Sequence, residues 1–111
     1  MEVELYYRKY KPGKFNYDMD QFEASRLTLE DLLHGYALVA EITQPEGTTA
    51  DRIFAMYQDR PVKLPLGVNH ESMSVGDIVL LDKTICVCCK RGWYKVELKS
   101  IPSRLVQILG S

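Results

Sequence analysis

The segment DIVLLDKTICVCCKRGWYKVEL (77–98) has the pattern of three short strands joined by two tight turns. Its apolar runs are rich in branched aliphatic, cysteine and aromatic residues, which favour strands, and they cover 77–82, 84–89 and 93–98. Charged residues and a glycine interrupt the runs at the spacing of consecutive hairpins. The segment therefore predicts a C-terminal three-stranded meander.

Upstream of the meander, the sequence predicts two further strands and two short helices. Aromatic and β-branched residues predict a strand over 3–10, and a nearly continuous apolar run predicts another over 36–43, which is expected in the middle of the sheet. Capping residues and acidic first turns predict helices over 28–35 and 49–59. The polar segment 16–26 is expected to be an ordered loop.

The order of these elements predicts the fold class. A chain of 111 residues with 46% apolar and 26% charged residues fits one folded domain, covering 1–111. Strands that follow one another in hairpins indicate an α+β domain with a mostly antiparallel sheet, two short helices on one side of it, and the C-terminal meander. The pattern of 104–109 leaves both an edge strand and a short helix open.

Charge and cysteine content bear on partners and compartment. A net charge of −1 argues against a strong overall attraction to nucleic acid or to an anionic membrane. Nine acidic and two basic residues lie in 17–59, whereas six basic residues and one acidic residue lie in 83–104. The two segments form either two solvated faces or, for the second segment, a basic face that binds phosphate or an acidic partner. An N-terminus without a secretory pattern and an odd number of cysteines, three, predict a cytoplasmic protein.

The cysteines have a spacing that does not suit a structural metal site. Zinc ligands usually come in pairs separated by two to four residues, whereas Cys86, Cys88 and Cys89 lie within one strand that points them to both faces. His34 and His70 each sit alone in other regions. We therefore expect buried, inert cysteines and no metal or cofactor. No glycine-rich phosphate loop, G-x-S-x-G or H-E-x-x-H motif is present, so we expect no catalytic residues and no enzyme activity.

A cluster of small polar residues precedes the first strand of the meander, at the end of a long connection punctuated by prolines. Ser72 and Ser74 can bond their own backbone and hold a turn, and Gly76 permits a backbone angle that other residues resist. Asp77 can then accept amide hydrogen bonds from the turn. The cluster accounts for strand entry without a ligand, although long ordered loops often carry function.

The last hairpin places basic residues beside Trp93 and Tyr94. On a strand, Tyr94 shares a face with Val96 and Leu98, and these three make the better core set. Trp93 is therefore expected on the more exposed face, where a large aromatic side chain calls for a functional reason.

Three segments together resemble the YodL-like domain family: ADRIFAMYQ (50–58), ESMSVGDIV (71–79) and CCKRGWYKVEL (88–98). In that family an Ile/Val-Phe helix precedes a Ser-Leu/Met-Ser-x-x-Asp-Val/Ile motif, and a strand pair with Gly-aromatic-Lys follows. The resemblance covers roughly residues 36–98. It implies a small domain of phage, conjugative-element and Firmicutes proteins, and it carries over no catalytic residues.

The sequence thus predicts a non-catalytic, cytoplasmic interaction domain of a mobile genetic element or its bacterial host. We expect it to bind another protein through the 60–76 loop and the 88–95 hairpin. The expected site residues are Ser72, Ser74, Asp77, Arg91 and Trp93. Trp93 would be the apolar anchor, because aromatic and arginine side chains dominate the energetics of interfaces.

The alternative hypothesis is a small nucleic-acid-binding protein that uses the basic C-terminal hairpin. Its binding residues would be Lys90, Arg91, Lys95, Lys99 and Arg104. No membrane partner is expected. An exposed edge strand at 104–109 would allow a homodimer.

Overall fold

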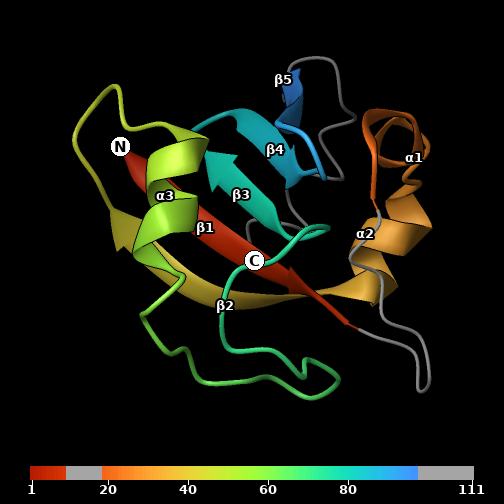
Figure 1. Cartoon of the computed structure of the whole chain (residues 1–111), viewed down its shortest axis with the longest axis horizontal. Coiled ribbons are helices and arrows are strands. Elements are labelled where there is room, and N and C mark those ends of the chain that lie inside the picture. Colours follow the sequence, from red (N-terminus) through yellow and green to blue (C-terminus); the bar gives the residue numbers. More distant parts are fainter. Residues whose placement is uncertain (10–18, 98–111) are drawn as a thin grey trace.

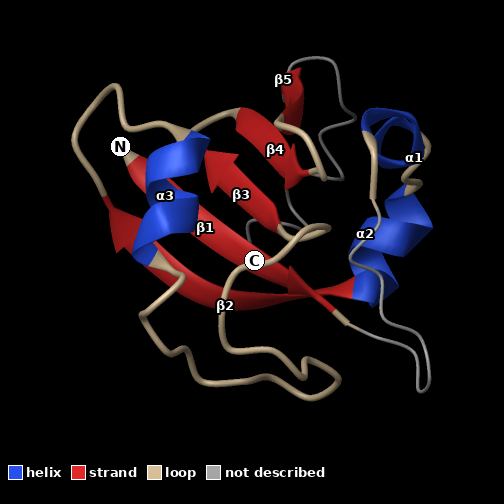
Figure 2. Ribbon diagram, in the orientation of Figure 1, coloured by secondary structure: helices blue, strands red, loops and turns tan. Residues whose placement is uncertain are grey.

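The residues that the structure describes, 1–9 and 19–97, form a five-stranded antiparallel sheet with three short helices (Figure 1 and Figure 2). In this computed structural model the strand order is β2-β1-β3-β4-β5. The strands are β1 (Glu2–Arg8), β2 (Tyr36–Thr43), β3 (Ile78–Leu81), β4 (Thr84–Cys88) and β5 (Trp93–Glu97). The helices are α1 (Gln21–Ser25), α2 (Leu29–Gly35) and α3 (Ala50–Met56). The α+β class, the antiparallel sheet and the meander of β3, β4 and β5 are confirmed.

Helix α1 lies inside the segment that was expected to be a loop, so the described part of the chain has three short helices instead of two. Asp20 begins the helix as its N-cap, and its Oδ1 atom accepts a hydrogen bond of 2.8 Å from the Glu23 amide. This is the usual role of aspartate at a helix start. The two predicted helices begin in the same way, with Thr28 and Thr49 as N-caps.

Strand β2 lies at an edge of the described sheet, so the expected central position of 36–43 is wrong. Among the described strands it pairs with β1 alone. Its apolar run reflects packing on both faces: Leu38 packs against one buried cluster, and Ala37 and Ile42 pack against the other. A continuous apolar run indicates that both faces of a strand are buried. It does not show that the strand pairs with another strand along each edge.

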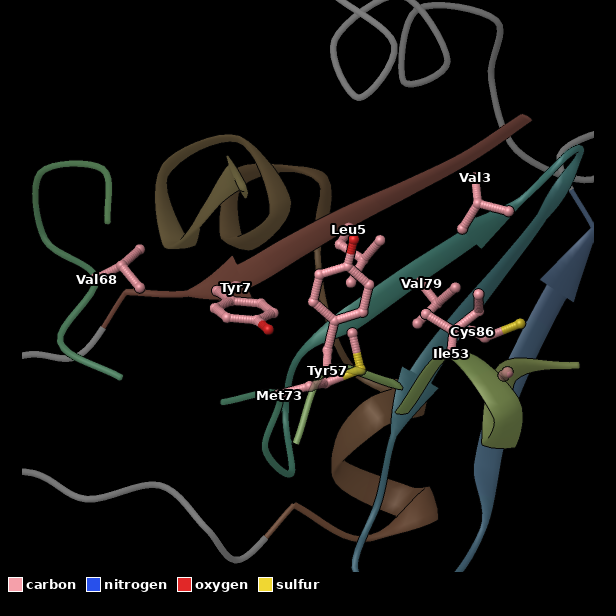
Figure 3. Packing of buried hydrophobic residues seen from close by; sticks show 10 residues of the cluster. Val3, Leu5, Tyr7, Ile53, Tyr57, Val68, Met73, Val79 and Cys86 are labelled. Atoms are coloured by element: carbon pink, nitrogen blue, oxygen red, sulfur yellow. The ribbon is translucent and has the colours of Figure 1, made fainter. Parts of the chain in front are cut away.

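Helices pack against both faces of the sheet, which corrects the expectation that they lie on one side. The α1–α2 face buries Tyr6, Met19, Ala24, Tyr36, Ile78, Leu80, Ile85, Val87 and Cys89. The α3 face buries Val3, Leu5, Tyr7, Ala50, Ile53, Tyr57, Val68, Met73, Val79 and Cys86 (Figure 3). Strands β1, β3 and β4 supply side chains to both clusters because successive strand residues point to opposite faces.

Two further expectations concern membrane-spanning helices and the C-terminal segment. Within the described ranges, no helix has the length and apolar character needed to cross a membrane. The segment 104–109, expected to be an edge strand or a short helix and a possible dimer edge, lies outside the described residues.

Candidate functional site

The connection from α3 to β3, which contains the 60–76 loop, is closed near its base by three hydrogen bonds. The Met73 amide donates to the Tyr57 carbonyl at 3.1 Å, and the Gln58 side-chain amide donates to the Met73 carbonyl at 2.9 Å. The Ser72 hydroxyl donates to the Gln58 carbonyl at 2.9 Å. These bonds join the end of α3 to the residues before β3, so the loop leaves and returns at one place.

Asp77 holds the returning end of the loop from inside the protein, where its side chain is 0% exposed. Its Oδ1 atom accepts a hydrogen bond from the Arg8 amide at 2.7 Å, and its Oδ2 atom accepts one from the Ser74 amide at 2.8 Å. The His70 Nε2 atom lies 2.8 Å from Oδ2 and 3.0 Å from Oδ1. We call Asp77 with these three partners the Asp77 anchor, because it ties β1, the loop and the start of β3 together.

Burial sets the electrostatics of this anchor. Desolvation raises the pKa of the Asp77 carboxyl above its ordinary value, while the hydrogen bonds from His70, Arg8 and Ser74 act in the opposite direction. The His70 ring also stacks on Tyr7, with centroids 4.9 Å apart and planes inclined by 14°. A histidine-aspartate pair can orient a catalytic imidazole. Here the side chains are only 8% and 0% exposed, so the pair is placed to hold the loop and is closed to a substrate in this conformation.

The far end of the loop is a tight turn that displays a leucine. The Val68 amide donates to the Pro65 carbonyl at 3.1 Å, and Gly67 has a φ of +91°, which suits glycine in such a turn. Val68 is buried in the α3-face cluster, whereas Leu66 is 96% exposed. The Lys9 side chain closes over Gly67, where an added Cβ would lie 3.3 Å from its carbons. We call residues 65–68 the Leu66 turn.

Ser74, Gly76 and Asp77 hold the turn as predicted, whereas the Ser72 hydroxyl bonds outside the turn, to the Gln58 carbonyl. The structure adds one residue that the sequence did not reveal. The Ser74 hydroxyl donates to the Ser72 carbonyl at 3.1 Å, and Gly76 has a φ of +97°. The Asp77 carboxylate accepts a hydrogen bond from a backbone amide of the turn. Asp77 is buried, so it shapes the loop from within and does not face a partner directly. His70, which looked isolated in the sequence, is the missing member of the anchor.

The 88–95 hairpin lies beside α1. It is hydrogen-bonded to the residues at the start of that helix. The Lys90 amide donates to the Met19 carbonyl at 2.8 Å, and the Gln21 side-chain amide donates to the Arg91 carbonyl at 3.3 Å. Phe22, the next residue of α1, is 66% exposed. The aromatic side chain most exposed near this basic turn is therefore Phe22, which sequence reasoning assigned to a loop.

Trp93 packs against α3, which corrects its expected place on an exposed face. Its Nε1 atom donates to Asp51 Oδ1 at 2.7 Å, and its ring meets Phe54 edge to face with centroids 6.2 Å apart. It is half-buried against the α3-face cluster. The alternation of Trp93 and Tyr94 between faces was right, but the face that carries Trp93 is covered by a helix. Trp93 is therefore a structural contact between β5 and α3.

The residues of the nucleic-acid hypothesis are only partly described. Lys90 and Arg91 are exposed at the β4–β5 turn, and Lys95 is exposed on β5. Lys99 and Arg104 lie outside the described residues. The hypothesis of a basic binding face stays a prediction.

All three cysteines are free and buried, as their pattern predicted. Burial raises the pKa of the Cys86 thiol to about 11 and that of Cys88 to about 12, and it also raises the pKa of Cys89. Across residues 1–9 and 19–97, no group of three or more His, Cys, Asp and Glu side chains is placed to hold a metal ion.

Cysteine alkylation provides a test of this packing. Because a rise of two pKa units lowers the thiolate fraction by about 100-fold, Cys86 and Cys88 should react with iodoacetamide at least about 100-fold more slowly in the folded protein than in denaturant. Mass spectrometry of timed samples measures the rate. Equal rates in the two states would contradict the buried placement of the thiols.

Comparison with known proteins yields no match to a family model, to a curated protein or to a solved structure. The resemblance to the YodL-like domain family therefore stays a prediction from the residues that carry it.

Proposed function

We propose that this domain is a non-catalytic module that binds another protein through the 60–76 loop. The observation that carries the proposal is the Leu66 turn, in which a leucine is 96% exposed on a loop that is fixed at both ends. Leu64, two residues earlier, is also exposed, at 38%. The YodL-like resemblance adds the expectation that the module serves a mobile genetic element or its bacterial host in the cytoplasm.

The fixed loop lowers the entropic cost of binding. A flexible loop loses conformational freedom when a partner orders it, whereas a loop already held by the Asp77 anchor and by buried Val68 loses little. Burying one leucine side chain at an interface contributes about 1.5–3 kcal/mol, which is enough to make a single residue dominate a small interface. Arg60 and Lys63 lie on the same loop and favour a partner whose apolar pocket has an acidic rim.

Replacement of Leu66 by serine should abolish partner binding and leave folding intact. The Leu66 side chain is almost fully exposed, so the free energy of unfolding should change by less than about 0.5 kcal/mol. To detect the partner, a photo-crosslinking amino acid is placed at position 66 and the domain is irradiated in its native host. The adduct is identified by mass spectrometry.

The matched control carries the same crosslinker at Lys83, an exposed residue of the β3–β4 turn. We expect an adduct from position 66 that is absent from position 83. Excess unlabelled wild-type domain should compete it away, and the Leu66→Ser domain should not. The proposed binding surface would be ruled out if the adduct forms equally from both positions. It would also be ruled out if unlabelled Leu66→Ser domain competes the adduct away as well as unlabelled wild-type domain does.

A further inference from the structure

Phe22 lines two hollows on the opposite side of the sheet from α3. The larger hollow, about 470 Å³, is lined by Asp20, Gln21, Phe22, Lys90 and Arg91. The smaller hollow, about 300 Å³, is also lined by Phe22 and includes Arg26 and Leu27. We call the larger hollow with the Phe22 ring the Phe22 surface. Its volume accommodates a large side chain together with a short stretch of backbone.

This surface is preformed by contacts between α1 and the β4–β5 turn. Two hydrogen bonds join them, from the Lys90 amide to the Met19 carbonyl and from the Gln21 side chain to the Arg91 carbonyl. The Arg26 guanidinium lies over the Phe22 ring, 5.4 Å from its centroid. Asp20 fixes the start of the helix as its N-cap. The neighbouring hairpin therefore holds the start of α1, and Arg26 of the same segment contacts the exposed ring.

The charges around the ring favour a peptide over a nucleic acid. Lys90 and Arg91 give the larger hollow two cations against one carboxylate, that of Asp20, so an acidic side chain is attracted there. Beyond the larger hollow the charges are mixed in sign, since Glu23 and Asp31 line the smaller hollow together with Arg8 and Arg26. A continuous row of phosphates would meet this mixture, whereas a single acidic side chain needs only the two cations of the larger hollow.

We infer that the Phe22 surface binds an extended protein segment that carries a large apolar side chain next to an aspartate or glutamate. The apolar side chain fills the larger hollow against the Phe22 ring, and the acidic side chain meets Arg91. Aromatic and arginine residues are the usual centres of binding energy in such interfaces. This surface is separate from the Leu66 turn, and the inference does not depend on the function proposed for that turn.

A peptide selection tests the inference. The folded chain is immobilised and exposed to a phage-displayed library of random peptides about 12 residues long. The strongest binder is then synthesised with a fluorescent label, and its affinity is measured by fluorescence anisotropy. We expect a shared apolar-acidic pair, and we expect Phe22→Ala and Arg91→Glu each to weaken binding by about tenfold or more. Circular dichroism confirms that both variants, altered at exposed residues, remain folded.

Lys83→Glu is the matched control, because it reverses an exposed cation on the β3–β4 turn and should leave this affinity unchanged. The inference is overturned if no peptide is enriched, or if the selected peptide binds Phe22→Ala as tightly as wild type. It is also overturned in favour of nucleic acid if a single strand of about 20 thymidines binds through Phe22 with affinity that falls steeply with salt.

Discussion

Replacing Asp77 by asparagine should lower the free energy of unfolding by about 2–4 kcal/mol, measured by urea denaturation. Each carboxylate oxygen accepts a backbone amide, Oδ1 from Arg8 and Oδ2 from Ser74. Asparagine keeps one acceptor and places an NH₂ group against the other N–H. A buried donor then faces a donor, His70 loses part of its hydrogen bonding, and the loop loses its link to β1.

The matched control is Asp82→Asn at the other end of β3. Asp82 is exposed and has a φ of 54°, a conformation that asparagine tolerates well. Its change in unfolding free energy should stay within about 0.5 kcal/mol. If Asp77→Asn unfolds at the same urea concentration as Asp82→Asn, the Asp77 anchor does not stabilise this fold.

Replacing Trp93 by alanine should lower the free energy of unfolding by about 2–3 kcal/mol, below the range for a fully buried tryptophan because Trp93 is only half-buried. The substitution removes the hydrogen bond to Asp51 and the edge-to-face contact with Phe54, two side-chain contacts between β5 and α3. Thermal and urea denaturation both measure the effect.

Trp93→Phe separates the two contributions. Phenylalanine retains much of the ring packing on Phe54 but cannot donate to Asp51, so the loss should be nearer 1 kcal/mol, the usual value for one hydrogen bond. A Trp93→Ala protein as stable as wild type would contradict the packing of Trp93 on α3 and would restore its expected role as an exposed anchor.

The sequence predicted most elements of the fold because their signals are local. Thr28 and Thr49 mark the starts of two helices, and the spacing of turns marks the meander. The prediction over 36–43 matched the bounds of β2. Helix α1 was missed because it has only five residues, too few for an apolar period to appear, although Asp20 with Glu23 was a usable capping signal.

The arrangement of those elements depends on contacts between distant parts of the chain. β1 pairs with β3, joining Leu5 to Val79, and this pairing pushes β2 to the edge. No local pattern encodes it. The position of α3 over the face that carries Trp93 is equally non-local, which is why that residue was expected to be exposed.

The contacts of the candidate site also divide into those that are local in sequence and those between distant residues. The sequence indicated Ser74, Gly76 and Asp77 as a turn, since their bonds span few residues. The amide that Arg8 donates to Asp77 comes from a residue 69 positions away in the chain. His70 lies seven residues before Asp77, and a His-x₆-Asp spacing has no regular meaning in an irregular loop. The exposure of Leu66 and the burial of Val68 in the α3-face cluster depend on where the turn lies against the sheet, which the sequence does not reveal.

Residue-resolved amide hydrogen exchange tests most directly the claim that Asp77 fixes the 60–76 loop. The Arg8 and Ser74 amides both donate to its side chain, so both should exchange slowly in the wild-type protein. The Asp77→Asn side chain keeps one acceptor oxygen, so at least one of the two amides should lose protection under conditions where the amides of β3 and β4 stay protected. If the two amides exchange in the wild-type protein as fast as in an unstructured peptide, the loop is not anchored and Leu66 is not presented on a fixed turn.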